Sequence, residues 1–157
     1  MENLLEGKSL VWVSLDEVGV FTAATRKMLV DHLANQAVKV QLIQAGNAED
    51  LSQITQRQVT GLVTLVMQDA SEVPATCKSL WRMRGRLDQP ICVCLIAPEM
   101  VEHVPLLLES GAQIVVSQLD VWQRALTRVL SRVQLSNRGF HPITASLIDR
   151  LPWPSEK

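Results

Sequence analysis

Residues 61–67 have the sequence Gly-Leu-Val-Thr-Leu-Val-Met, a run without the alternation of polar and apolar side chains that marks a half-exposed strand. A second run, at residues 90–98, is again apolar throughout. Short uninterrupted runs of this kind are typical of strands that are covered on both faces, as in a parallel sheet. The two segments therefore predict the centre of a sheet with helices on both sides.

Outward from this centre, short apolar runs alternate with helical patterns. Three further runs predict strands at residues 10–13, 38–43 and 114–117. Each of the five strands is followed by an amphipathic pattern or a helix-capping signal, which predicts helices at residues 22–33, 47–57, 71–84, 106–110 and 120–133. In the third of these helices, we expect Val73, Cys77, Leu80 and Trp81 to form the apolar stripe. Five such units predict an open, doubly wound α/β sheet, in which sites lie beyond the carboxyl ends of the strands.

The length and composition indicate a single domain with a large hydrophobic core. The chain has 157 residues, of which 47% are hydrophobic and 20% charged, with a formal net charge of -1. Such a balance provides no overall field that would attract nucleic acid or an anionic membrane, so neither is an expected partner. No apolar run approaches the ~20 residues that span a bilayer, and the acidic start does not resemble a signal peptide. We therefore expect a cytoplasmic protein.

Motifs for catalysis and cofactor binding are missing from the sequence. A lone Gly19 follows the first strand where a dinucleotide site would need a Gly-x-Gly-x-x-Gly motif, and no Gly-Lys-Ser/Thr phosphate loop occurs. The three histidines lie in separate segments, and Cys92 and Cys94 are expected to fill the core as reduced thiols. We expect no metal, no cofactor and no enzymatic activity. A small-ligand or flavin-binding domain of the flavodoxin-like class is kept as an alternative.

Residues 106–112, Leu-Leu-Leu-Glu-Ser-Gly-Ala, precede a predicted strand and a final helix. This order resembles the leucine-rich helix, small-Gly-Ala turn, fifth strand and last helix of the receiver domains of bacterial response regulators. The layout matches over about residues 9–133, and we assign residues 1–133 to a receiver-like domain. The resemblance implies a five-stranded, parallel, doubly wound flavodoxin-like (βα)5 sandwich of three layers, followed by a helical C-terminal extension.

The resemblance also implies where a phosphorylation site would lie. The family binds Mg²⁺ through an acidic pair after strand 1 and phosphorylates an Asp after strand 3. A Thr or Ser after strand 4 and a Lys after strand 5 read the phosphate. In this chain Ser14 and Leu15 fall on the acidic pair and Val66 or Met67 on the acceptor, while Ala97 and Gln118 replace the hydroxyl and the lysine.

These departures predict a degenerate site, because a hard cation needs several oxygen ligands and a phosphoaspartate needs a neutralising cation. We therefore interpret the chain as a pseudo-receiver that acts through protein contacts in signalling or regulation. In the alternative, a shift of register places Asp16, Glu17 and Asp69 at the site, where they would bind Mg²⁺. The chain would then be a phosphorylatable single-domain response regulator.

Charged side chains on the last elements predict a homodimer. In the receiver family, the fourth helix, fifth strand and fifth helix commonly form a symmetric contact through charged pairs. The corresponding elements here carry both signs of charge, on Glu102, Glu109, Asp120, Arg124, Arg128 and Arg132. A two-fold contact would pair them reciprocally. A second basic set, Lys78, Arg82, Arg84 and Arg86, belongs to the third helix and its end.

Residues 134–157 form the predicted extension. Residues 136–139 suggest a break, after which His141 and Pro142 can open a short helix. The extension carries apolar and aromatic side chains that are candidates for docking, namely Phe140, Leu147, Leu151 and Trp153. The segment would pack either on its own domain or into the groove of a partner.

Overall fold

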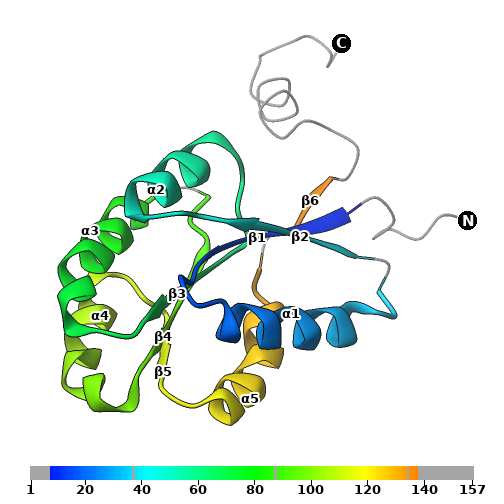
Figure 1. The fold of residues 1–157 in the computed structure, drawn as a ribbon. Coiled ribbons are helices and arrows are strands. Elements are labelled where there is room, and N and C mark those ends of the chain that lie inside the picture. The colour runs from blue at the N-terminus through cyan, green and yellow to red at the C-terminus, as the bar shows by residue number, and fades with distance from the viewer. Residues whose placement is uncertain (1–7, 37, 87, 134, 138–157) are drawn as a thin grey trace, which may run out of the picture.

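The computed structural model describes residues 8–36, 38–86, 88–133 and 135–137 (Figure 1). One sheet carries five parallel strands in the order β2-β1-β3-β4-β5. The strands are β1 (Lys8–Leu15), β2 (Lys39–Gln44), β3 (Leu62–Met67), β4 (Ile91–Ile96) and β5 (Ile114–Val116). This order is that of the flavodoxin-like doubly wound fold. The fold class predicted from the sequence is confirmed.

Five α-helices connect the strands and cover both faces of the sheet (Figure 1). They are α1 (Val20–Leu33), α2 (Ala48–Arg57), α3 (Val73–Met83), α4 (Val104–Ser110) and α5 (Leu119–Leu130). Short 3-10 helices, η1 (Ala70–Glu72) and η2 (Pro98–His103), lead into α3 and α4. Helices α1 and α5 lie on one face, here named the α1/α5 face, and α2, α3 and α4 on the other, the α2–α4 face.

The core of the α1/α5 face contains two tryptophans that are fully buried, Trp12 on β1 and Trp122 on α5. The indole N–H of Trp12 donates to Thr64 Oγ1 at 2.8 Å, and that of Trp122 donates to Thr25 Oγ1 at 2.8 Å. An unpaired buried N–H would cost free energy, so each threonine hydroxyl offsets the desolvation of an indole. These pairs join β1 to β3 and α1 to α5.

The core of the α2–α4 face is formed by aliphatic side chains, methionines and thiols. Cys92 and Cys94 lie on the same side of β4, as expected for positions two residues apart, and both are buried. Burial raises the pKa of the Cys92 thiol from 9.0 to about 12, and burial also raises the pKa of Cys94. The prediction that these cysteines are thiols of the core is confirmed.

The beginning of β1 differs from the prediction in a way that involves the extension. Strand β1 begins at Lys8, four residues before Trp12, its first residue paired with β3. The first residues of β1 thus extend beyond the ladder with β3, and the edge of a sheet offers backbone groups to a further strand. A short antiparallel strand, β6 (Ser136–Asn137), pairs with Lys8 and Ser9 in this place. Residues 136 and 137 thus continue the sheet where a break was expected.

The docking candidates of the extension, Phe140, Leu147, Leu151 and Trp153, lie outside the described residues, as does the predicted short helix. Among the residues that are described, no helix combines the length and the apolar character needed to cross a membrane.

Candidate functional site

The carboxyl ends of β1, β3, β4 and β5 form the edge at which a doubly wound sheet carries its sites. Strand β1 extends to Leu15, two residues further than predicted, so Asp16 and Glu17 follow it directly. Asp16 is half-buried, whereas Glu17 is exposed. The acidic pair therefore lies closer to the end of the strand than the sequence suggested.

The carboxylate of Asp16 binds the first turn of α1. Its Oδ1 accepts a hydrogen bond from the Gly19 amide at 2.9 Å. Its Oδ2 accepts from the Thr22 amide at 3.0 Å and from Thr22 Oγ1 at 2.8 Å. Gly19, at the N-cap position, has a φ of 89° and no side chain, so Asp16 supplies the capping oxygen from three residues upstream. A negative charge in this place also suits the helix dipole.

Ser14 extends this polar cluster into the core. Its side chain is buried, and its Oγ lies 2.7 Å from Thr22 Oγ1. Ser14, Thr22 and Asp16 form a continuous hydrogen-bonded chain from the sheet to the α1 N-terminus. Ser14 thus occupies a position where the receiver family carries an acid, and the hydrogen bond of its hydroxyl helps to fix the first turn of α1.

The end of β3 lacks an acid. Val66 and Met67, the last residues of the strand, are buried in the cores of opposite faces. Asp69 comes two residues later, is exposed, and caps η1 by accepting a hydrogen bond from the Ser71 amide at 3.1 Å. Glu72 completes the capping box, because its Oε1 accepts from the Asp69 amide at 3.2 Å.

The two positions that would read a phosphate carry neither a hydroxyl nor a cation. Ala97 follows β4, and its amide donates to the Met67 carbonyl at 3.2 Å. Gln118 is the exposed N-cap residue of α5; its carbonyl accepts from the Trp122 amide at 3.2 Å, and its side chain forms no capping hydrogen bond. Both residues serve the backbone turns that lead into η2 and α5.

A magnesium ion needs several oxygen ligands in one place. Both oxygens of Asp16 already accept hydrogen bonds from α1, and Asp69 caps a different helix. Across the described residues, no three side chains of His, Cys, Asp or Glu are grouped as metal ligands would be. Asp16, Glu17 and Asp69 therefore do not fit a magnesium site in this arrangement.

The predicted dimer residues lie on η2, α4 and α5, or just after α5, and are exposed. Asp120 and Arg124 form an ion pair of 3.4 Å within one chain, and Glu102 lies 3.8 Å from the imidazole of His103. Within the described part of the chain, Arg128 and Arg132 have no ion-pair partner. This surface thus has free cations on α5 and at its end, and acids on η2 and α4.

The prediction that Trp81 belongs to the apolar stripe of α3 is wrong. The side chain is 64% exposed, because Val73, Leu80 and Met83 already fill the buried face of the helix. Lys78 and Arg82, at one-turn spacing and next to Trp81, are exposed on the same side. Their charges were the sequence signal that this side of α3 faces solvent.

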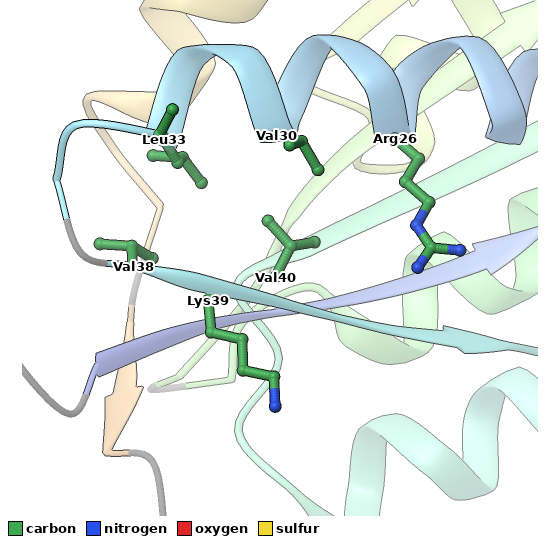
Figure 2. A pocket seen from close by; sticks show the side chains of 7 residues that line it. Arg26, Val30, Leu33, Val38, Lys39 and Val40 are labelled. Carbon is green, nitrogen blue, oxygen red and sulfur yellow. The ribbon is translucent and has the colours of Figure 1, made fainter.

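A shallow depression of about 470 Å³ lies between α1 and β2 (Figure 2). Val30 and Val40 point toward each other across it, while Lys39 points to the other side of the strand (Figure 2). Lys39 is the first residue of β2, so the depression lies at the amino end of this strand. Ligands of doubly wound sheets bind at the carboxyl ends instead, so this depression does not provide the flavin site considered as an alternative.

No protein-family model matches the chain, and no curated protein matches it by sequence. Among solved structures, a response regulator from Thermotoga maritima is similar, with a TM-score of 0.61 and 16% identity over 78% of this chain and 98% of that chain. The receiver domain of a sensor histidine kinase from Pseudomonas aeruginosa PAO1, with a magnesium ion coordinated in its active site cleft, has a TM-score of 0.51 and 15% identity. That match covers 80% of this chain and 98% of the other. Together with the strand order, these similarities show that the chain has the fold of response-regulator receiver domains.

Proposed function

We propose that the protein is a non-enzymatic pseudo-receiver, a signalling or regulatory module that acts through protein contacts without an aspartyl phosphate. The observation that carries this proposal is the end of β3, where Val66 and Met67 are buried core residues in place of a phosphorylatable acid. The hydrogen bonds that occupy both oxygens of Asp16 support it further. The module would work in the cytoplasm, where Cys77, Cys92 and Cys94 remain thiols.

Amide NMR of the labelled protein tests the proposal. Mg²⁺ is added first, and then beryllofluoride, which mimics an aspartyl phosphate. We expect the amide signals of Asp16, Glu17, Asp69 and Gln118 to stay in place, because the residues that the structure describes form no complete oxygen site for the cation. An Asp69→Asn variant serves as the matched control for any signal that does move.

One observation favours the phosphorylatable alternative, namely that Asp16 and Glu17 directly follow β1. If Mg²⁺ binds there, it would compete with the α1 N-terminus for the oxygens of Asp16 and with the cap of η1 for those of Asp69. Shifts at both places that are lost in Asp69→Asn, and that spread to α5, would overturn the pseudo-receiver proposal.

We further propose that the module forms a homodimer through α4, β5 and α5. Free Arg128 and Arg132 on one subunit would meet Glu102 and Glu109 on the other, and a two-fold axis would repeat each contact. Sedimentation of the full chain measures its mass. Reversal of the charges in the variant Arg128→Glu with Arg132→Glu is expected to give monomers, and an unchanged dimer mass would exclude this contact.

A further inference from the structure

Trp81 is a large apolar side chain on the α2–α4 face that core packing does not explain. It is 64% exposed, whereas Trp12 and Trp122 are fully buried. Lys78, Trp81 and Arg82 have the i, i+3, i+4 spacing that places them on one side of α3, and all three are exposed. An indole in solvent between two cations contributes little to the core. It has the features of a contact residue.

Arg84, just after α3, holds the indole in position. Its guanidinium carbon lies 5.1 Å from the centre of the Trp81 ring, and its Nη1 donates to the Glu109 carbonyl at 2.7 Å. Arg84 therefore connects the ring to the last turn of α4. A side chain that is ordered before binding loses less conformational entropy when a partner arrives. Trp81 is thus a preorganised anchor.

Among the described residues, the cations around Trp81 have no acidic partners. In the part of the chain that the structure describes, Lys78, Arg82 and Arg84 form no ion pair with a carboxylate. By contrast, Arg86, which lies slightly further along, pairs with Asp88 at 3.6 Å and donates to the Thr55 carbonyl at 2.6 Å. The positive charges of Lys78 and Arg82 are therefore available to a ligand, and Arg84 adds a charge that no carboxylate neutralises among the described residues, whereas Arg86 is paired with Asp88.

We propose that Lys78, Trp81, Arg82 and Arg84, here named the α3 surface, bind an acidic protein segment with an apolar side chain that packs on the indole. The inference rests on the proposed function of a protein-interaction module and names the chemistry of its partner. Tryptophan and arginine are the residue types that dominate binding energy at protein interfaces. Complementary charge would steer an acidic segment to the unpaired cations.

The α3 surface suits an acidic protein better than a nucleic acid. Proteins that bind single strands stack successive bases on several aromatic side chains along a basic groove. The α3 surface has one indole, on a convex helix. The exposed residue Glu109 lies on the neighbouring helix α4, and its backbone carbonyl accepts the hydrogen bond from Arg84.

The experiment uses the full chain and three kinds of fluorescent probe, measured by anisotropy at low and high salt. The first is a set of short acidic peptides with one central Leu, Phe or Trp, and the second is the same set with amides in place of the carboxylates. The third is a short oligothymidylate. We expect the acidic set to bind at least about tenfold more tightly than the amide set at low salt, with the difference shrinking in high salt.

Variants assign the binding to α3. Trp81→Ala is expected to weaken the acidic peptides by about tenfold or more, and Lys78→Glu with Arg82→Glu to remove detectable binding. The matched control, Arg26→Glu with Lys27→Glu on α1, makes the same change of net charge on the opposite face and is expected to leave binding unchanged. Circular dichroism verifies that each variant is folded.

Three results would overturn the inference. Acidic peptides that bind no better than their amide versions would exclude charge recognition, and an equal loss in the α1 control would exclude the α3 surface. Tighter binding of oligothymidylate would identify a nucleic-acid surface instead. The beryllofluoride titration is independent of all three, so failure of the α3 surface can be distinguished from failure of the pseudo-receiver proposal.

Discussion

The two faces of the sheet use the same residue type in opposite ways. On the α1/α5 face, Trp12 and Trp122 are fully buried, and each indole N–H is bound to a threonine hydroxyl. On the α2–α4 face, the core contains no tryptophan among the described residues, and Trp81 lies outside it, 64% exposed and next to an arginine. The first face uses its large aromatic groups for packing. The second presents one to solvent.

The difference shows how to recognise a tryptophan that stabilises the fold: its indole N–H is buried and has a hydrogen-bond partner, because a buried N–H without a partner would cost free energy. An indole in the core needs a partner for its N–H, and the chain places Thr64 and Thr25 opposite the two buried indoles. An exposed indole needs no such partner, because water provides one. Mutations should therefore affect the two faces differently. Changes to the buried tryptophans and their threonine partners on the α1/α5 face should lower the free energy of unfolding, whereas changes at Trp81 should leave it nearly unchanged.

The largest effect is expected for Trp122→Ala. Removing a fully buried aromatic side chain leaves a cavity between α5 and the sheet and also frees the hydroxyl of Thr25. The free energy of unfolding should fall by about 3–5 kcal/mol. Urea denaturation, followed by circular dichroism, measures the change. Trp122→Phe, which keeps most of the volume, should cost less, and equal losses in the two variants would show that the cavity is not the cause.

Thr25→Val tests the hydrogen bond separately from the volume. Valine has nearly the shape of threonine, but it leaves the indole N–H of Trp122 without a partner in the core. The expected loss is about 1–3 kcal/mol in the free energy of unfolding. Thr127→Val is the matched control, because Thr127 is exposed on α5 and its hydroxyl contacts His32 at 3.1 Å. Similar losses at both threonines would contradict the role assigned to burial.

Asp16→Ala has a smaller expected effect. The variant removes the carboxylate that accepts hydrogen bonds from Gly19 and Thr22, so the first turn of α1 loses its cap. Loss of an N-terminal cap costs about 1 kcal/mol. Glu17→Ala, at the neighbouring exposed position, should change the free energy of unfolding much less. An unchanged stability in Asp16→Ala would mean that the carboxylate has another task, such as binding a cation.

The sequence predicted the architecture because the strands at its centre are unusually uniform. Residues 62–67 and 91–96 are almost continuously apolar, and a strand of this kind has few alternatives to the middle of a parallel sheet. The ends of the strands were predicted less accurately than their centres. Ser14 ends the continuous apolar run of the first strand, but its hydroxyl is satisfied by Thr22, eight residues further along the chain, and β1 continues to Leu15.

The candidate site depends more on such tertiary contacts than the fold does. Asp16 was known to lie near the end of the first strand, but its hydrogen bonds to α1 require the positive φ of Gly19 and the burial of Thr22. The pairing of β6 with β1 depends on the relative starts of two strands that are far apart in sequence. Neither arrangement leaves a periodic pattern in the sequence, so neither could be predicted from it.

Trp81→Ala is expected to have the smallest effect on stability, although the same variant should weaken binding to acidic peptides. Its indole is already mostly in water, so little apolar surface is exposed by the change. The variant loses the contact with Arg84, a cation–π pair worth about 0.5–1 kcal/mol at an exposed site. Alanine is the better helix former and offsets part of that loss, so the net change should stay within about 0.5 kcal/mol. A loss as large as that of Trp122→Ala would mean that Trp81 supports the core after all, and that the two faces of the sheet do not differ in the way proposed.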